Sequence, residues 1–115
     1  MTRSHKPIVW SLFAAGGTYA AFFAPVLILV TGLAVTLGLL PADALSYERI
    51  LGFARHPIGK AFLFFTVFLL AWHSAHRLRI TAHDFGLRAD GLVMAACYGL
   101  AALGSVVAAV ALLRM

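Results

Sequence analysis

The sequence predicts an all-α integral membrane protein whose three transmembrane helices form a small bundle. Composition is the first reason, because 63% of the 115 residues are hydrophobic, only 11% are charged and the mean hydropathy is +0.96. Soluble domains are about half apolar and about a quarter charged, so a soluble fold of this size would expose too much apolar surface. The distribution of charge is the second reason, because short polar segments separate three long apolar runs.

The first apolar run, residues 8–40, contains no charged side chain over 33 residues. A continuous helix of this length would measure about 50 Å, whereas the hydrocarbon core of a bilayer is about 30 Å thick. Tilt, a kink at Pro25 or an interfacial first turn around Trp10 would absorb the difference, and we favour an interfacial entry followed by a span over residues 11–39. The run is about twice as long as the apolar region of a cleaved signal peptide, so we expect it to be retained.

The second run, residues 58–75, carries only Lys60 and extends with its flanks to an expected span of 58–78. The third, residues 92–113, has 22 residues without a charge, enough to cross a bilayer once with little tilt. Segments 41–57 and 79–91 are then loops, and the first has room for a short helix that Asp43 or Ser46 would cap. We find no internal repeat or linker, so residues 1–115 are expected to form a single membrane domain.

The net charge of +5 places basic residues at the ends of apolar runs. This placement is typical of contacts with anionic lipid headgroups and of residues that set membrane topology, and it argues against binding of nucleic acid. The single cysteine, Cys97, lies inside the third run and is expected to be a small apolar packing residue, since it has no partner for a disulfide. Any redox cofactor is therefore expected to be non-covalent or to belong to another chain.

The positive charges favour a cytoplasmic N-terminus by five to four, a weak form of the positive-inside pattern. The five on the N-terminal side are Arg3, Lys6, Arg77, Arg79 and Arg88. The four on the other side are Arg49, Arg55, Lys60 and Arg114.

Small residues recur at a spacing of four in the first and third runs, which allows helix backbones to approach closely in lipid. In the third run they form three sets: Ala95 and Gly99; Ala101, Ser105 and Ala109; and Gly104 and Ala108. Such faces serve packing within the chain or against another subunit, and the sequence leaves both open.

Three histidines and two arginines lie within the eleven residues 73–83, where the second run ends: His73, His76, Arg77, Arg79 and His83. A metal site would need further ligands, but the cluster has no cysteine nearby and only Asp84 as a carboxylate. A bis-histidine haem would need a ligand from another chain, because the first and third spans contain no histidine. Ion transport would need acidic groups within the membrane, and all four acids lie in loops. Nor does any serine or threonine have an evident base beside it.

What these residues offer is a group of hydrogen-bond donors at a membrane surface. Trp10 lies at the same surface if the first two spans are antiparallel. An apolar channel for a lipid tail would then extend from these donors into the membrane. A quinone fits such a place, because its carbonyl oxygens accept hydrogen bonds and its redox chemistry needs protons that histidine relays. An aromatic belt with arginines reaching the headgroups has the same composition, so the residues alone leave both interpretations open.

Four segments carry a resemblance to a known family: PIVWSLFAAGG, FFAPV, LPADALSYERIL and HSAHRLRITAHD, in this order. With these spacings the chain resembles the D subunit of bacterial fumarate reductase, a small three-helix membrane anchor. The likeness runs from about Pro7 to Asp84 and continues more loosely through CYGLAALGS. DALSYER and the His–Arg pair that ends the second span are its most specific parts.

The resemblance implies a four-subunit quinol:fumarate reductase in which this chain is not catalytic on its own. FAD and iron–sulfur clusters would be held by the flavoprotein subunit and the iron–sulfur subunit. With a second anchor, the C subunit, this chain would attach that pair to the cytoplasmic face of the bacterial cytoplasmic membrane, with its N-terminus cytoplasmic and its C-terminus outside. The two anchors would bind menaquinol without haem, and the matching positions here are Trp10, His76 and Arg77. No catalytic or metal-binding residue is implied.

Two departures from the family pattern bear on this expectation. Better-known members carry further histidine just after the His–Arg pair, where this chain has Arg79 and Ile80. His73 replaces a small or thiol residue, which leaves its role and the details of proton relay open. The alternatives are a purely structural anchor of a related succinate:quinone oxidoreductase, and an autonomous oligomeric channel or transporter.

Overall fold

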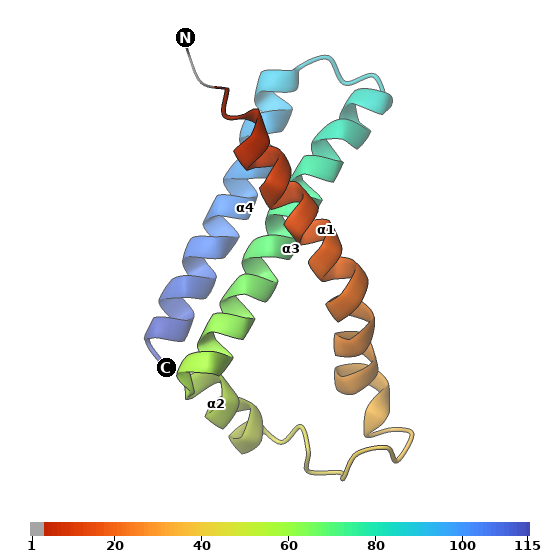
Figure 1. Ribbon diagram of the computed structural model, residues 1–115, viewed down its shortest axis with the longest axis vertical. Coiled ribbons are helices and arrows are strands. Elements are labelled where there is room, and N and C mark those ends of the chain that lie inside the picture. The colour runs from red at the N-terminus through yellow and green to blue at the C-terminus, as the bar shows by residue number, and fades with distance from the viewer. Residues whose placement is uncertain (1–3) are drawn as a thin grey trace.

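The computed structural model describes residues 4–115, so the predicted topogenic Arg3 lies outside the described residues. Three long helices and one short helix make up the described part, which has no strand. The elements are α1 (Lys6–Ile28), the π-helical segment η1 (Leu29–Ala34), α2 (Tyr47–Arg55), α3 (Pro57–Asp84) and α4 (Asp90–Leu113). Figure 1 shows α3 between α1 and α4, with the N-terminus and the α3–α4 link at one end and α2 and the C-terminus at the other.

The predicted architecture of three membrane-spanning helices is confirmed. Within the described part, the helices long and apolar enough to cross a membrane are Lys6–Ala34, Pro57–Asp84 and Asp90–Leu113. The helices do not end where the sequence predicted the spans to end. Helix α3 continues to Asp84, through the first part of the predicted loop 79–91, and the first helix starts at Lys6. Whether its first turn lies at the membrane interface stays a prediction. The depth of each end in the bilayer stays a prediction.

The first helix changes its winding in its second half. Pro25 lies inside α1 and cannot donate a backbone hydrogen bond, and the wider turns of η1 begin four residues later at Leu29. Prolines and π-helical turns are two of the few recognised causes of helix bending. A kink at Pro25 was one of the ways in which the first span could be shortened, and the structure has a π-helical segment after Pro25 that the sequence did not indicate.

Short polar motifs set the ends of α2 and the start of α3. Ser46 takes the extended N-cap position of α2, although its side chain makes no capping bond. Asp43, the other predicted cap, instead accepts a hydrogen bond from Arg49 at 2.8 Å. At the start of α3, Nδ1 of His56 accepts a hydrogen bond from the Ile58 backbone N–H at 3.2 Å, and Pro57 takes the first helical position, where its missing N–H costs least.

Helix α3 ends in a glycine turn that brings the chain directly into α4. Gly86 has a φ of 83°, a left-handed conformation that glycine adopts without steric cost. Its N–H donates to the His83 carbonyl at 2.9 Å, and the Leu87 N–H donates to the Ala82 carbonyl at 3.0 Å. These two bonds form a Schellman motif, which satisfies carbonyls that the helix end would leave unpaired. The link between α3 and α4 is thereby reduced to residues 85–89.

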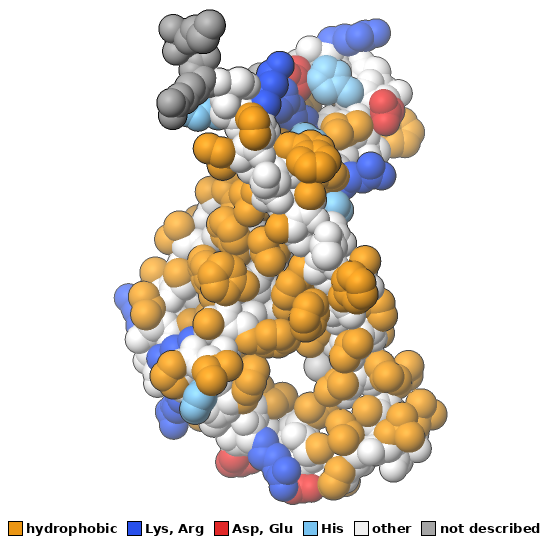
Figure 2. Space-filling view, viewed as in Figure 1, with side chains coloured by type: hydrophobic (Ala, Val, Ile, Leu, Met, Phe, Trp, Pro, Cys, Tyr) orange, Lys and Arg blue, Asp and Glu red, His pale blue; other side chains and the backbone are white. Residues whose placement is uncertain are grey.

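Small residues make the helix contacts, and large side chains point outward. The buried side chains of the described part include Ala34, Ala54, Ala75, Ala101 and Ser105, and no large side chain is fully buried. Figure 2 shows apolar side chains over most of the surface, while charged groups gather at the two ends. This inside-out distribution is expected in a bilayer, where close backbone packing rather than exclusion of water holds helices together.

Helix α1 crosses α3 in close contact at Gly16. A Cβ atom placed on Gly16 would lie 2.6 Å from the Leu69 carbonyl oxygen and 2.7 Å from Cβ of His73. No side chain fits there, so glycine is required by space. Toward the other end the two helices diverge (Figure 1).

The three small-residue sets on α4 have different surroundings. Ala101 and Ser105 are buried in the described structure, whereas Gly99 and Gly104 have open space around them. The set that contains Ala101 and Ser105 thus packs within this chain. Packing of the others against a second subunit stays a prediction.

Replacing Gly16 by alanine should weaken the bundle, because either α1 or His73 must shift to admit the methyl group. Overpacking of this kind costs about 1–3 kcal/mol, and we expect a lower midpoint of thermal unfolding for the protein in detergent. Gly99→Ala is the matched control, because its methyl group meets open space in α4. Equal midpoints for the two variants would contradict the close contact.

Candidate functional site

Trp10 and His76 lie on the same open groove, at the end of the bundle that carries the N-terminus. The groove has a volume of about 570 Å³ and is bordered by Ser4, His5, Lys6, Val9, Trp10 and His76. Trp10 is 69% exposed, so its indole is free to meet a ligand or another chain. The structure thus brings together two of the three residues that the sequence singled out, one from α1 and one from α3.

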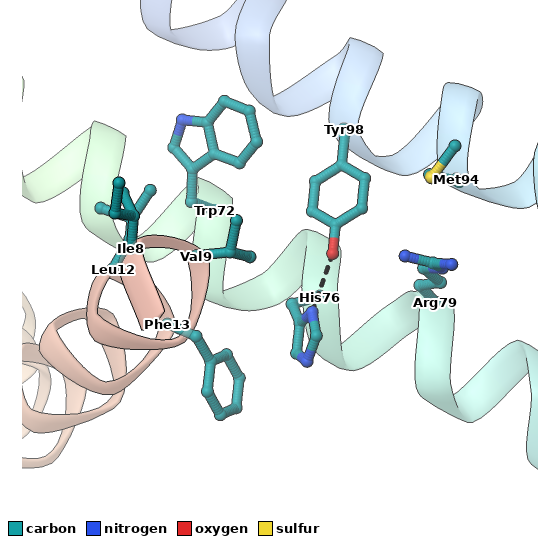
Figure 3. Close-up of a pocket in the computed structure, with 9 residues that line it drawn as sticks. All are labelled: Ile8, Val9, Leu12, Phe13, Trp72, His76, Arg79, Met94 and Tyr98. Atoms are coloured by element: carbon teal, nitrogen blue, oxygen red, sulfur yellow. Dashed lines mark hydrogen bonds between the residues drawn. The ribbon is translucent and has the colours of Figure 1, made fainter. Parts of the chain in front are cut away.

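An apolar cavity of about 340 Å³ lies beside this groove, between α1, α3 and α4 (Figure 3). It is lined by Ile8, Val9, Leu12, Phe13, Trp72, His76, Arg79, Met94 and Tyr98. Val9 and His76 line both the groove and the cavity. A polar edge therefore adjoins an apolar chamber, and His76 lies where the two meet.

His76 is held by contacts from the two neighbouring helices. Its Nδ1 is 2.8 Å from the Tyr98 hydroxyl of α4, and its ring lies 4.6 Å from that of Phe13 of α1, measured between centroids. Figure 3 shows the second ring nitrogen, Nε2, pointing away from Tyr98. Within residues 4–115, Nε2 makes no hydrogen bond, which leaves it available to a ligand.

His73, whose role the sequence left open, lies in the crossing of α1 and α3. Its Nδ1 donates to the Phe13 carbonyl oxygen at 3.1 Å, and its ring stacks on the Phe13 ring with centroids 4.5 Å apart. One turn further along α3, His76 meets the same Phe13 ring. His73 therefore fixes the part of α1 that carries the wall of the cavity.

Arg77 does not line the groove or the cavity. It follows His76 directly, and successive residues of a helix point about 100° apart, so its exposed side chain lies on an adjoining face of α3. The arginine that does reach the cavity is Arg79, three residues after His76. Residues three apart share one side of a helix, and this spacing is the signal in the sequence that indicates Arg79.

Arg79 is locked to the start of α4. Its Nε and Nη2 atoms donate to the two carboxylate oxygens of Asp90 at 2.9 and 2.7 Å, and Nε2 of His83 lies 2.8 Å from the same carboxylate. Paired N–H donors on one carboxylate fix orientation as well as distance. The carboxylate that meets the basic cluster is therefore Asp90, across the glycine turn, and not the neighbouring Asp84 that the sequence indicated.

Tyr98 completes the wall of the cavity and was not among the residues predicted from the sequence. Its ring lies 5.6 Å from that of Trp72, and the Arg79 guanidinium carbon lies 6.0 Å from its centroid. Eight residues, or just over two helical turns, separate Tyr98 from Asp90. That spacing turns Tyr98 about 80° from Asp90 around α4, so only pairing of α4 with α3 shows that Tyr98 faces His76.

Within residues 4–115, no three histidine, cysteine, aspartate or glutamate side chains gather as they would to hold a metal ion. The site offers the His76 ring nitrogen, the Trp10 indole, the Tyr98 phenol and the Arg79 guanidinium beside apolar walls. Such groups can bind a small amphipathic molecule through hydrogen bonds at its head and apolar contact with its tail.

Comparison with known proteins decides the family. The family model for the D subunit of fumarate reductase matches residues 1–113. The chain belongs to the fumarate reductase D subunit family. The predicted resemblance is therefore confirmed over nearly the whole sequence.

Individual members of the family are similar along most of their length. The fumarate reductase D subunit of Photobacterium profundum is 46% identical over 106 residues, covering 92% of this chain and 88% of the relative. The Vibrio vulnificus protein of the same name is 43% identical, over 94% and 86% of the two chains. That of Mycobacterium bovis is 44% identical, over 98% and 90%.

Family and fold together give a coarse role. The chain is a membrane-anchor subunit of fumarate reductase, an accessory part of a larger complex, and its three apolar helices fit a multi-pass membrane protein.

The Arg79–Asp90 pair should keep the α3–α4 link closed. Asp90→Asn removes the charge that both Arg79 and His83 meet, so we expect faster hydrogen exchange at the amides of residues 85–93, measured by mass spectrometry. Asp43→Asn is the matched control, because it breaks the more exposed pair with Arg49 at the other end and should leave this segment unchanged. Equal exchange in wild type and Asp90→Asn would show that the glycine turn alone holds the link.

Proposed function

We propose that this chain anchors fumarate reductase in the bacterial cytoplasmic membrane and contributes part of its menaquinol site. In this proposal a second anchor, the C subunit, packs against it, and the two attach the flavoprotein and iron–sulfur subunits, which carry FAD and the clusters. The chain itself performs no catalysis and holds no haem. The observation that carries the proposal is that Trp10 and His76 border one groove next to an apolar cavity.

The chemistry of the two spaces supports a quinol as the ligand. A quinol has a polar ring with two hydroxyl groups and an apolar tail, and its oxidation releases two electrons and two protons. The groove offers the Trp10 N–H as a donor and the His76 Nε2 as a donor or acceptor. The cavity beside them has walls that suit an apolar ring face or the first part of a tail. Electrons would pass to the iron–sulfur subunit, which we expect to cover the exposed indole.

The basic residues of the sequence favour a cytoplasmic N-terminus and an outer C-terminus by five to four, and Arg3, outside the described residues, makes the difference. The end with the groove carries Lys6, Arg77, Arg79 and Arg88 among the described residues, and Figure 2 shows basic groups gathered there. A positive surface at this end suits both anionic headgroups and attachment of the soluble subunits. The opposite end would then face outward with the exposed Arg49–Asp43 pair.

His76→Ala in the assembled complex should lower kcat/KM for menaquinol oxidation by about tenfold or more. One lost hydrogen bond accounts for up to about tenfold, and a lost proton acceptor would add to this. Fumarate reduction with a soluble dye as electron donor should keep its wild-type rate, because the flavoprotein and iron–sulfur subunits are unchanged. Wild-type quinol kinetics in this variant would remove His76 from the site.

Arg77→Ala tests whether the third matching residue reaches the quinol from its neighbouring face. If the guanidinium donates to the ring oxygen in the complex, its loss should cost about 1.5–3 kcal/mol, or about ten- to a hundredfold in affinity. Arg55→Ala, at the opposite end of the bundle, is the control for loss of one positive charge. Should both variants oxidise quinol as well as the wild type, Arg77 would be removed from the quinol site.

A further inference from the structure

We propose that Tyr98 is a positioning residue for quinol oxidation, which acts by fixing the His76 ring so that Nε2 faces the quinol. The inference rests on the proposed function, because it gives His76 the quinol contact. It adds a residue from the third membrane-spanning helix, α4, to a site that the matching positions had assigned to α1 and α3 alone.

The geometry of His76 leaves it one free nitrogen. The Tyr98 hydroxyl occupies Nδ1 at 2.8 Å, so rotation of the imidazole about its last side-chain bond would break that hydrogen bond. With Nδ1 held by Tyr98, Nε2 points away from Tyr98, as Figure 3 shows. Without the phenol the ring could turn over and present either nitrogen to the groove.

A hydroxyl is well suited to this position because it both donates and accepts. When the Tyr98 O–H donates to Nδ1, the neutral ring carries its proton on Nε2 and can donate to a quinone carbonyl. When Nδ1–H donates to the phenol oxygen, Nε2 has a free lone pair and can accept from a quinol hydroxyl. Tyr98 can therefore satisfy Nδ1 with either form of the ligand in place, while the direction of Nε2 stays the same.

The phenol itself is held on several sides. Trp72 packs on its ring at 5.6 Å between centroids, and the Arg79 guanidinium carbon lies 6.0 Å from the ring centre. Arg79 is in turn fixed by its two hydrogen bonds to Asp90. The salt bridge that closes the α3–α4 link thus also supports the residue that orients His76.

A second tyrosine provides a matched control. Tyr19 of α1 pairs with the Thr66 hydroxyl of α3, which is also a hydrogen bond between two helices. Tyr19 stacks on Phe23 and is not among the residues that line the groove or the cavity. Tyr19→Phe therefore loses an interhelical hydrogen bond without touching His76.

The test compares Tyr98→Phe, Tyr19→Phe, His76→Ala and the Tyr98→Phe/His76→Ala double variant in the assembled, membrane-bound complex. We expect Tyr98→Phe to lower kcat/KM for menaquinol by about three- to tenfold, the effect of one neutral hydrogen bond. Tyr19→Phe should leave it unchanged. In the His76→Ala background, Tyr98→Phe should have no further effect, because a residue that acts through His76 has nothing left to orient. Dye-linked fumarate reduction and complex yield check assembly in each variant.

A spectroscopic measurement reports directly on the His76 ring and would not change if Tyr98→Phe only loosened helix packing. The ¹⁵N signals of His76 in the purified complex, assigned by their loss in His76→Ala, should shift in Tyr98→Phe and stay in place in Tyr19→Phe. Full quinol activity in Tyr98→Phe alongside impaired His76→Ala would overturn this inference and leave the proposed function standing. An undiminished Tyr98→Phe effect in the His76→Ala background would also overturn it. Wild-type quinol kinetics in His76→Ala would contradict the proposed contact between His76 and quinol, and this inference would fail with it.

Discussion

The close approach of α1 to α3 at Gly16 sets how the α1 residues of the candidate site lie against those of α3. Because a glycine faces the Leu69 carbonyl and His73, the two backbones come nearer than any side chain would allow. The Phe13 ring then reaches His73 and His76 of α3, and Trp10, on the exposed side of α1, comes to border the same groove as His76. A bulkier residue at position 16 would force the two helices or His73 to shift, and with them the contact of Phe13 with the two histidines.

The other half of the site depends on how α3 returns into α4. The glycine turn at Gly86 and the Arg79–Asp90 pair together align the first turns of α4 with the last turns of α3. Tyr98 and Met94 are thereby placed over His76 and Arg79 as walls of one cavity. The polar contacts that organise the site lie at this end of the bundle, while the middle of the bundle relies on small residues and on the Tyr19–Thr66 hydrogen bond.

Most of the architecture could be predicted from the sequence, because length and hydropathy are enough to identify helices that cross a bilayer. Helix ends were harder, since residues 79–84 are polar enough to suggest a loop and yet continue α3 to Asp84. The site was predictable only in part. Trp10 and His76 belong to recognisable strings, whereas Tyr98 lies in an apolar stretch where nothing distinguishes a ligand-facing phenol from one at the lipid surface. Its importance arises from pairing of α3 with α4, and single-sequence patterns do not encode that pairing.

The π-helical segment Leu29–Ala34 has a consequence for how sequences of different length should be aligned. A π-helical turn holds about one residue more than an α-helical turn. Removal of a single residue between positions 29 and 34 would convert the π-helical turns to α-helical turns. The residues on either side would still face the same neighbouring helices. A one-residue gap at this place therefore marks a change of winding, and the residues on either side of it remain structurally equivalent.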